Sequence, residues 1–334
     1  MSISKQKVIA NYLPNTTEPG TKADAFAPSN IALCKYWGKR DVELNLPINA
    51  SLSISLGELG SHTTLSESDR GQDQVYLNNE LLSLDSPFAR KVIGFIDLFR
   101  RDLKQPVQVR TVNNIPTAAG LASSASGFAA LTLAIDKFYR FDLALDHLSA
   151  FARMGSGSAS RSLYQGFVEW HKGSREDGMD SCAERLALEW PGFRIGLLKV
   201  ATGEKKVDSR SGMQRTVESA ALYSAWPQQA ANDLVAIKRA IQQQDLECLG
   251  QTAEQNALSM HATMIASWPP LLYWQPESVA AMHRVWELRA SGVPVYLTMD
   301  AGPNLKLLFQ HADEMQVRDA FPELVDADIV APFG

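Results

Sequence analysis

The feature that most constrains the fold of this chain is a run of very small residues between an expected strand and an expected helix. Residues 113–127 read NNIPTAAGLASSASG. They follow a β-rich segment at 107–112 and precede the apolar segment 128–141, FAALTLAIDKFYRF, which predicts a buried helix. In such an arrangement, small residues let a ligand approach the backbone N–H groups at the helix N-terminus. The run is therefore a candidate binding loop for a polyphosphate.

The run by itself leaves two interpretations open. The hydroxyl groups of Ser123, Ser124 and Ser126, together with the helix dipole, favour phosphate binding. It is not a Walker A loop, because GxxxxGK[ST] is absent and no lysine follows Gly120. A turn whose small residues only pack against a neighbouring helix would have the same local sequence.

Chain length and the order of elements favour two α+β domains. At 334 residues the chain exceeds the size at which one hydrophobic core keeps growing. Strands and helices are interleaved without the strict rhythm of a doubly wound sheet. We place the boundary near residue 191, which gives an N-terminal domain of residues 1–191 and a C-terminal domain of residues 192–334.

The strand predictions rest on alternation and β-rich composition. Residues 49–56, NASLSISL, alternate between apolar residues and serines and predict a strand with one buried side. Two β-rich runs at 63–65 and 75–77 are joined by a polar segment, so we expect them to pair as an antiparallel hairpin. Further strands are expected at 193–200 and 294–299.

The helix predictions rest on apolar spacing and on end signals. Ser86 is a good N-cap and Pro87 a good first residue for a helix that continues to about Leu103. Residues 1–24 show no clear period and read as a loose lead-in. Other helices are expected at 143–154, 161–170, 233–243, 246–265 and 277–290.

Charge and cysteine usage exclude several classes of protein. The net charge of −5 argues against a chain that neutralises nucleic-acid phosphates or coats an anionic membrane. Three widely separated cysteines without a CxxC pair fit reduced thiols in a cytoplasmic protein, and six histidines show no metal-binding spacing. No stretch approaches the roughly 20 apolar residues that span a bilayer. We therefore expect a soluble cytoplasmic enzyme.

Four charged residues are candidates for chemistry. Asp300 follows the strand expected at 294–299, so it is a candidate general base, although capping of the turn in DAGPN is the simpler alternative. Arg161 lies in GSGSASRS, where its planar guanidinium could hold a carboxylate; an exposed arginine is the alternative. Lys35 and Lys39 flank two aromatic residues in KYWGK. This pattern alone does not distinguish phosphate binding from simple stacking of aromatic rings against basic side chains.

Taken together, the motifs resemble the GHMP kinase superfamily, and within it the diphosphomevalonate decarboxylase branch, where Ala122 stands in place of the glycine usual in the kinases. The resemblance covers nearly the whole chain in order. Its segments are APSNIALCKYWGKRD (27–41), LPINASLSISL (46–56), PTAAGLASSASG (116–127), GSGSASRSLYQGFVEW (155–170), SRSGM (209–213), NALSMHATMIASWPP (256–270) and MDAGPN (299–304).

The resemblance implies a two-domain GHMP-kinase-like fold with the active-site cleft between the domains. It implies the use of ATP and Mg²⁺ to phosphorylate the 3-hydroxyl of mevalonate 5-diphosphate, followed by loss of phosphate and CO₂ to give isopentenyl diphosphate. It also implies a homodimer. The alternative is a kinase of the same family that phosphorylates mevalonate or a mevalonate phosphate and stops there.

The resemblance also implies roles for individual residues. The catalytic set would be Asp300, Lys35, Arg161 and Ser124. Substrate contacts would come from Asn30, Tyr36, Lys39, Ser156, Arg161, Ser209 and Arg210. The ATP phosphates would lie on Pro116, Ala118, Ala119, Gly120, Leu121, Ala122, Ser123 and Ser124, and no protein side chain is assigned as a metal ligand.

The chain departs from the family pattern at two places. Leu77-Asn78-Asn79 replaces the usual Leu-Asn-Gly, and Asp208 precedes Ser209 where a serine is usual. Both lie outside the expected catalytic set. They bear on substrate detail more than on the type of reaction.

Overall fold

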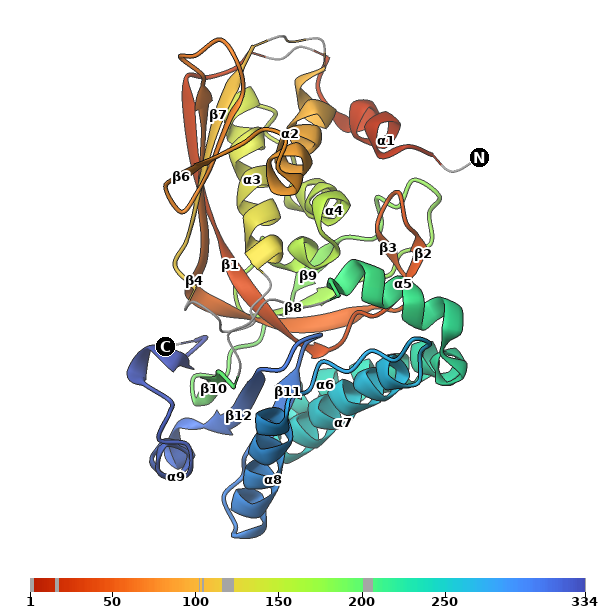
Figure 1. The fold of residues 1–334 in the computed structure, drawn as a ribbon, viewed down its shortest axis with the longest axis vertical. Coiled ribbons are helices and arrows are strands. Elements are labelled where there is room, and N and C mark those ends of the chain that lie inside the picture. The colour runs from red at the N-terminus through yellow and green to blue at the C-terminus, as the bar shows by residue number, and fades with distance from the viewer. Residues whose placement is uncertain are drawn as a thin grey trace.

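The computed structural model describes residues 3–15, 18–101, 103, 105–115, 123–200 and 207–333, which form a seven-stranded and a four-stranded β-sheet with helices packed on them, and a separate two-stranded hairpin (Figure 1). Of the expected phosphate-loop residues, Ser123 and Ser124 lie within these ranges. The others, Pro116, Ala118, Ala119, Gly120, Leu121 and Ala122, lie outside the described residues.

The elements follow one another in mixed order. Up to residue 185 they are α1 (Lys5–Tyr12), β1 (Lys22–Cys34), β2 (Lys39–Asp41), β3 (Leu46–Pro47), β4 (Ser51–Glu67), β5 (Gln74–Leu77), β6 (Glu80–Leu82), α2 (Pro87–Arg100), β7 (Val107–Asn113), α3 (Ser123–Tyr139), α4 (Leu145–Gly155), η1 (Gly157–Arg161), β8 (Phe167–Trp170) and β9 (Ala183–Arg185). The rest are β10 (Phe193–Leu198), α5 (Ser209–Ser219), η2 (Ala221–Ala225), α6 (Trp226–Gln243), α7 (Leu246–Ile265), α8 (Pro276–Ala290), β11 (Tyr296–Met299), β12 (Leu305–Gln310), η3 (His311–Asp313), α9 (Glu314–Ala320), η4 (Asp326–Asp328) and β13 (Ile329–Val330).

The larger sheet has seven strands in the order β6-β5-β7-β4-β8-β9, with β1 paired to β4. The hairpin expected between 63–65 and 75–77 is wrong. Residues 63–65 belong to the long strand β4, and β7 lies between β4 and β5. Strand β5 pairs with β7 in parallel, so the polar segment after β4 crosses over a strand that comes later in the chain.

Residues 51–56 of β4 are buried on both faces, so the expectation of one buried side for this segment is also wrong. The serines on one face form hydrogen bonds with other segments of the chain. Ser51 accepts from Arg161, and the hydroxyl of Ser55 donates to Gln165. Leu52 and Ile54 on the other face pack in a core with helices of the second half of the chain. The alternation of apolar residues and serines correctly predicted a strand. The serines on its second face are buried, however, and not exposed to solvent.

Helix α2 begins as its sequence predicts. The Ser86 hydroxyl accepts the backbone N–H of Ala89 at 3.2 Å, and Pro87 is the first helical residue. Its apolar face packs with α3 in the core of the first half of the chain. In Figure 1, α2, α3 and α4 lie together on one side of the large sheet.

The smaller sheet has the strand order β11-β12-β10-β13, and all its pairs are antiparallel. Helices α6 and α7 pack against each other and contact β1. The apolar cluster formed here includes Leu33 and Phe167 of the large sheet together with Ile195 and Trp226 from after residue 191. One apolar cluster is therefore shared by the two halves, in addition to a separate cluster in each.

Two further predictions are corrected by the structure. The helix expected over 161–170 is instead the last residue of η1 followed by β8, which pairs antiparallel with β4. The lead-in at 1–24 contains helix α1, whose N-cap Ser4 accepts from Lys7 at 3.3 Å, and the start of β1. None of the described helices is both long enough and apolar enough to cross a membrane.

Candidate active site

A cavity of about 690 Å³ lies where the two halves of the chain meet. Its walls come from β1, η1, the start of α3, the start of α5 and the turn after β11. The candidate residues that line it are Asn30, Lys35, Tyr36, Lys39, Ser124, Ser156, Arg161, Ser209, Arg210 and Asp300. The structure thus brings together every expected site residue that it describes except Ser123.

Asp300 is held between two lysines. It follows β11, and its Oδ1 lies 3.0 Å from the Nζ of Lys35. Its Oδ2 lies 3.6 Å from the Nζ of Lys306, a residue that the sequence analysis did not single out. Both lysines are nearly inaccessible, whereas the Asp300 side chain is 31% exposed. The Asp300 carboxylate therefore faces the cavity, with the two lysine ammonium groups on its buried side.

Lys35 is anchored at the end of β1. Its Nζ also donates to the carbonyl of Ala32 at 2.7 Å, and its backbone N–H donates to Oδ1 of Asn256 on α7 at 2.7 Å. Burial lowers the pKa of Lys35, and the nearby Asp300 carboxylate opposes that shift. The positive charge of Lys35 is therefore stabilised by the Asp300 carboxylate and not by water.

Arg161 is buried at the end of η1, so the alternative of an exposed arginine is wrong. Its Nη1 donates to the Ser51 hydroxyl, and both Nε and Nη2 lie 3.4 Å from Oδ1 of Asn30. Burial lowers the pKa of Arg161 to about 10. The described partners are neutral, so a guanidinium facing this cavity favours an incoming anion.

The start of α3 reaches η1 through two hydroxyl groups. Ser124, at the N-terminal end of α3, and Ser156, just before η1, have their Oγ atoms 3.4 Å apart. Helix N-termini favour negative charge, and both hydroxyls can donate to phosphate oxygens.

Three basic side chains gather at the far end of the cavity. Lys39 donates to Oδ1 of Asn45 at 2.6 Å, and Lys91 lies over the ring of Phe128 at 4.4 Å. Burial, reinforced by the neighbouring Arg210, lowers the pKa of both lysines to about 8. We call Lys39, Lys91 and Arg210 the cation triad. Such a triad suits a group with several negative charges, such as a diphosphate.

Arg210 is positioned by the residue that departs from the family pattern. Asp208 is the N-cap of α5, and its Oδ1 accepts the backbone N–H groups of Arg210 and Ser211 at 2.9 and 3.2 Å. An aspartate caps a helix as well as a serine does. The departure therefore preserves the local structure that presents Ser209 and Arg210.

Tyr36 packs tightly in the cavity wall. Its ring meets Trp170 edge-on with centroids 4.7 Å apart, and its hydroxyl has no hydrogen-bond partner among the described residues. A Cβ on Gly157 would lie 2.8 Å from the Tyr36 ring, which explains the glycine there. A buried hydroxyl of this kind is available to a ligand.

Three residues at the site were missed in the sequence. Lys306 is a single cation in the apolar strand LKLLF of β12, and this was the available signal. His261 on α7 lies 3.1 Å from the carbonyl of Asp300, and burial lowers its pKa to about 4, so it supports the turn as a neutral ring. Lys91 sits on α2 with no local motif around it.

The oxygen atoms that line the cavity suit a metal ion that is held mainly by the phosphate groups of a ligand. Within the described part of the chain, no group of three or more His, Cys, Asp and Glu side chains is arranged to hold a metal ion. The oxygen-bearing side chains that line the cavity include Ser124, Ser156 and Asp300. Mg²⁺ prefers such hard oxygen ligands and keeps part of its shell as water and phosphate.

Comparisons with known proteins agree along the chain. The family profile "Diphosphomevalonate decarboxylase-like N-terminal domain" matches residues 27–183, and "Mevalonate 5-diphosphate decarboxylase C-terminal domain" matches residues 197–328. The diphosphomevalonate decarboxylase of Candida albicans is 38% identical, over 88% of this chain and 86% of its own.

Solved structures show the same likeness. MDDEF in complex with MVAPP, AMPPCP and magnesium is similar with a TM-score of 0.85 and 38% identity, covering 93% of this chain and 95% of its own. Mevalonate diphosphate decarboxylase from Staphylococcus aureus gives a TM-score of 0.84 and 38% identity, over 93% and 94% of the two chains.

Proposed function

The chain belongs to the diphosphomevalonate decarboxylase family, and from this premise we propose that it converts mevalonate 5-diphosphate and ATP to isopentenyl diphosphate, CO₂, ADP and phosphate. The observation that carries the proposal is the pairing of Lys35 with Asp300, beside the buried Arg161, in a cavity that ends at a cation triad. Arg161 would bind the substrate carboxylate, the cation triad would bind its diphosphate, and Asp300 would act as the base on its 3-hydroxyl.

The first step is phosphoryl transfer to the 3-hydroxyl of the substrate. Asp300 accepts the hydroxyl proton, the oxygen forms a bond to the γ-phosphorus of ATP, and ADP leaves with the electrons of the broken P–O bond. Lys35 holds the carboxylate in place and stabilises negative charge on the transferring group. Ser124 orients the phosphoryl group from the helix N-terminus.

The second step removes phosphate and CO₂. The C3–O bond breaks and phosphate leaves with its electron pair, while the electrons of the C1–C2 bond form the new C2=C3 double bond. Arg161 binds the carboxylate with its planar fork and so fixes the C1–C2 bond for cleavage. Asn30 orients Arg161 by accepting from it at 3.4 Å.

The remaining contacts bind the two polyphosphates. The substrate diphosphate lies on Lys39, Arg210, Ser209, Tyr36 and Ser156. The loop with Pro116, Ala118, Ala119, Gly120, Leu121, Ala122 and Ser123 cradles the ATP phosphates. The ATP phosphates and the hydroxyl of Ser124 would hold Mg²⁺, which would supply neutralisation of the negative charge during transfer.

The organisation of the chain is part of the proposal. We infer a domain boundary near residue 191, with residues 1–191 and 192–334 on either side, because the large sheet ends at β9 and the small sheet begins at β10. A homodimer and a cytoplasmic location follow from the family resemblance and the reduced cysteines. Sedimentation of the purified chain tests the dimer.

An assay of ADP and phosphate release tests the function. With ATP alone, no ADP should form; with mevalonate 5-diphosphate added, ADP and inorganic phosphate should appear in a 1:1 ratio. A kinase that stops after transfer would release ADP without inorganic phosphate. That result would replace the proposed activity with the family alternative.

A further inference from the structure

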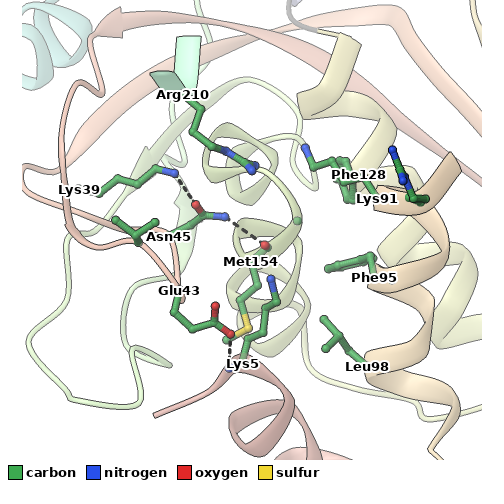
Figure 2. A pocket seen from close by; sticks show the side chains of 14 residues that line it. Lys5, Lys39, Glu43, Asn45, Lys91, Phe95, Leu98, Phe128, Met154 and Arg210 are labelled. Carbon is green, nitrogen blue, oxygen red and sulfur yellow. Dashed lines mark hydrogen bonds between the residues drawn. The ribbon is translucent and has the colours of Figure 1, made fainter. Parts of the chain in front are cut away.

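A second cavity, of about 250 Å³, adjoins the active site and is not used by the proposed reaction. It lies between α1, the β2–β3 hairpin and the helices α2, α3 and α4 (Figure 2). The two cavities share Lys39, Asn45, Lys91 and Arg210 as lining residues. The cation triad therefore stands at the boundary and faces both.

The mouth of the second cavity is strongly positive. Among the described residues that line it, Lys5, Lys39, Arg90, Lys91 and Arg210 are basic and Glu43 alone is acidic. Glu43 accepts the backbone N–H of Lys5 at 3.2 Å, at the opposite end from Arg210 in Figure 2. The contact described for Lys91 is with an aromatic ring, which leaves its ammonium available to an anion.

Beside the triad and the charged groups of Lys5, Glu43 and Arg90, the cavity also has an apolar wall. Phe95 and Leu98 of α2, Phe128 of α3 and Met154 of α4 line it. Figure 2 shows Phe95 and Leu98 below Lys91 and Phe128, with Met154 across the cavity beside Lys5. Gly94, one turn after Arg90, also lines the cavity, and a Cβ built there would meet nothing within 4 Å. The helix thus leaves open space beside an apolar surface.

We propose that this cavity binds the hydrocarbon tail of an alkyl or alkenyl diphosphate whose diphosphate lies on the cation triad, and that such a compound inhibits the enzyme. The proposal rests on the triad's proposed role in binding the substrate diphosphate. The substrate directs its polar tail toward Arg161 and Asp300, whereas the inhibitor directs an apolar tail the opposite way, toward Phe95 and Leu98. The two share the triad, so inhibition is competitive with mevalonate 5-diphosphate.

The chemistry selects this class of ligand. Polar tails gain nothing beside Phe95, Leu98 and Met154, whereas each methylene removed from water gains binding free energy. The cavity is smaller than the range typical of sites for drug-sized molecules, so it suits a tail of about five carbons. The reaction product has this form, because loss of the carboxylate and hydroxyl leaves an apolar five-carbon diphosphate.

A series of methyl, propyl, pentyl and decyl diphosphates tests the proposal. Inhibition constants against mevalonate 5-diphosphate should fall by about fourfold for each methylene up to pentyl. They should level off at decyl, because the cavity is then full. Equal inhibition by methyl and pentyl diphosphate would overturn the proposal.

The variant Gly94→Leu fills the open space without touching the proposed catalytic or substrate-binding residues. It should weaken inhibition by pentyl diphosphate at least about tenfold and change that by methyl diphosphate less than twofold, with turnover of the substrate unchanged. Gly94→Ala is the matched control, since it makes a similar helix-propensity gain with little added volume. Pentyl inhibition that survives Gly94→Leu would contradict the location.

Calorimetry separates this proposal from the proposed function. Pentyl diphosphate should bind the wild-type chain in the absence of ATP and substrate, and Gly94→Leu should weaken that binding by the same factor. If the chain turns over substrate but pentyl diphosphate binds no better than methyl diphosphate, only the second cavity is refuted. If pentyl diphosphate binds but no turnover occurs, only the proposed reaction is refuted.

Discussion

At the scale of single residues, Asp300 is the group on which the proposed chemistry turns. Two buried lysines face its oxygens at 3.0 and 3.6 Å, and His261 contacts its backbone carbonyl at 3.1 Å. Neighbouring positive charge favours the ionised carboxylate. The same contacts fix its direction, so that it meets a hydroxyl carried by a substrate anchored at both ends.

Asp300→Asn should lower kcat by at least about 100-fold, because the amide cannot accept the proton of the 3-hydroxyl. Binding of mevalonate 5-diphosphate and ATP should not weaken, since the change removes a negative charge beside anionic ligands. Single-turnover kinetics and calorimetry measure the two effects. Asp319→Asn, at an exposed position, is the control, and normal turnover in Asp300→Asn would contradict the role of base.

Arg161→Lys should lower kcat/KM by about 10- to 100-fold although charge is conserved. A lysine cannot form two parallel bonds to a carboxylate, and it leaves Ser51 or Asn30 with fewer partners. Steady-state kinetics checks this, with the exposed Arg185→Lys as control. A loss confined to thermal stability, with unchanged kcat/KM, would make Arg161 a structural residue.

Substrate binding should weaken as pH rises through about 8. Lys39 and Lys91 have pKa values lowered to about 8, so in the free enzyme they lose their charge above this pH, and with it their attraction for the diphosphate. The KM for mevalonate 5-diphosphate should rise by roughly tenfold or more between pH 7 and pH 9.

Replacing both lysines by arginine supplies the control for this pH dependence. Arginine stays charged over the whole range, so the rise in KM should disappear. A KM that rises equally in the double variant would mean that some other group titrates.

The sequence identified most of the described site residues, mainly through resemblance and not through local pattern. For Arg161, the alternative of an exposed side chain was removed only by the fold, which buries it. The role of Asp300 as a base stays a prediction. Lys91 and Lys306 were missed because their neighbours in the chain are ordinary helix and strand residues. Their proximity to the site depends on the packing of α2 and the pairing of β12, which a single sequence does not display.

At the scale of elements, α7 links Lys35, the proposed catalytic lysine, to the core of the second half. Asn256 accepts the backbone N–H of Lys35 and donates to Oδ2 of Asp233 on α6, both at 2.7 Å. The residue is fully buried. One side chain thus ties the end of β1 to two helices that come two hundred residues later.

Asn256→Leu should lower the free energy of unfolding by about 2 to 3 kcal/mol, because it leaves the N–H of Lys35 unsatisfied and removes one of the two described hydrogen bonds to the Asp233 carboxylate, the other coming from Gln229. Urea denaturation measures the change. Gln255→Leu, exposed on the same helix, should change it by less than about 0.5 kcal/mol. An equal effect of both substitutions would exclude the proposed link.

Element predictions succeeded where signals are local. The cap Ser86 and the first residue Pro87 defined α2, and alternation defined the first part of β4. The predicted pairing of residues 63–65 with 75–77 was wrong, because the position of β7 between β4 and β5 depends on contacts between segments that are distant in the chain. The segment 161–170 failed because burial of β8 on both faces removes the alternation that marks a strand.

At the scale of the whole molecule, the active site exists only where the two halves meet. Lys35 and Arg161 come from the large sheet and its neighbours, whereas Asp300 and Arg210 come from the second half. The shared apolar core fixes their relative position. In the proposed reaction, this arrangement places Arg161 at the substrate carboxylate, Asp300 at the 3-hydroxyl and Arg210 at the diphosphate.

Release of labelled CO₂ per ADP tests this account most directly. With mevalonate 5-diphosphate labelled at the carboxyl carbon, we predict one labelled CO₂ for each ADP in a single turnover, and neither product above background in Asp300→Asn. ADP formation without labelled CO₂, or a stable 3-phosphorylated product, would contradict it.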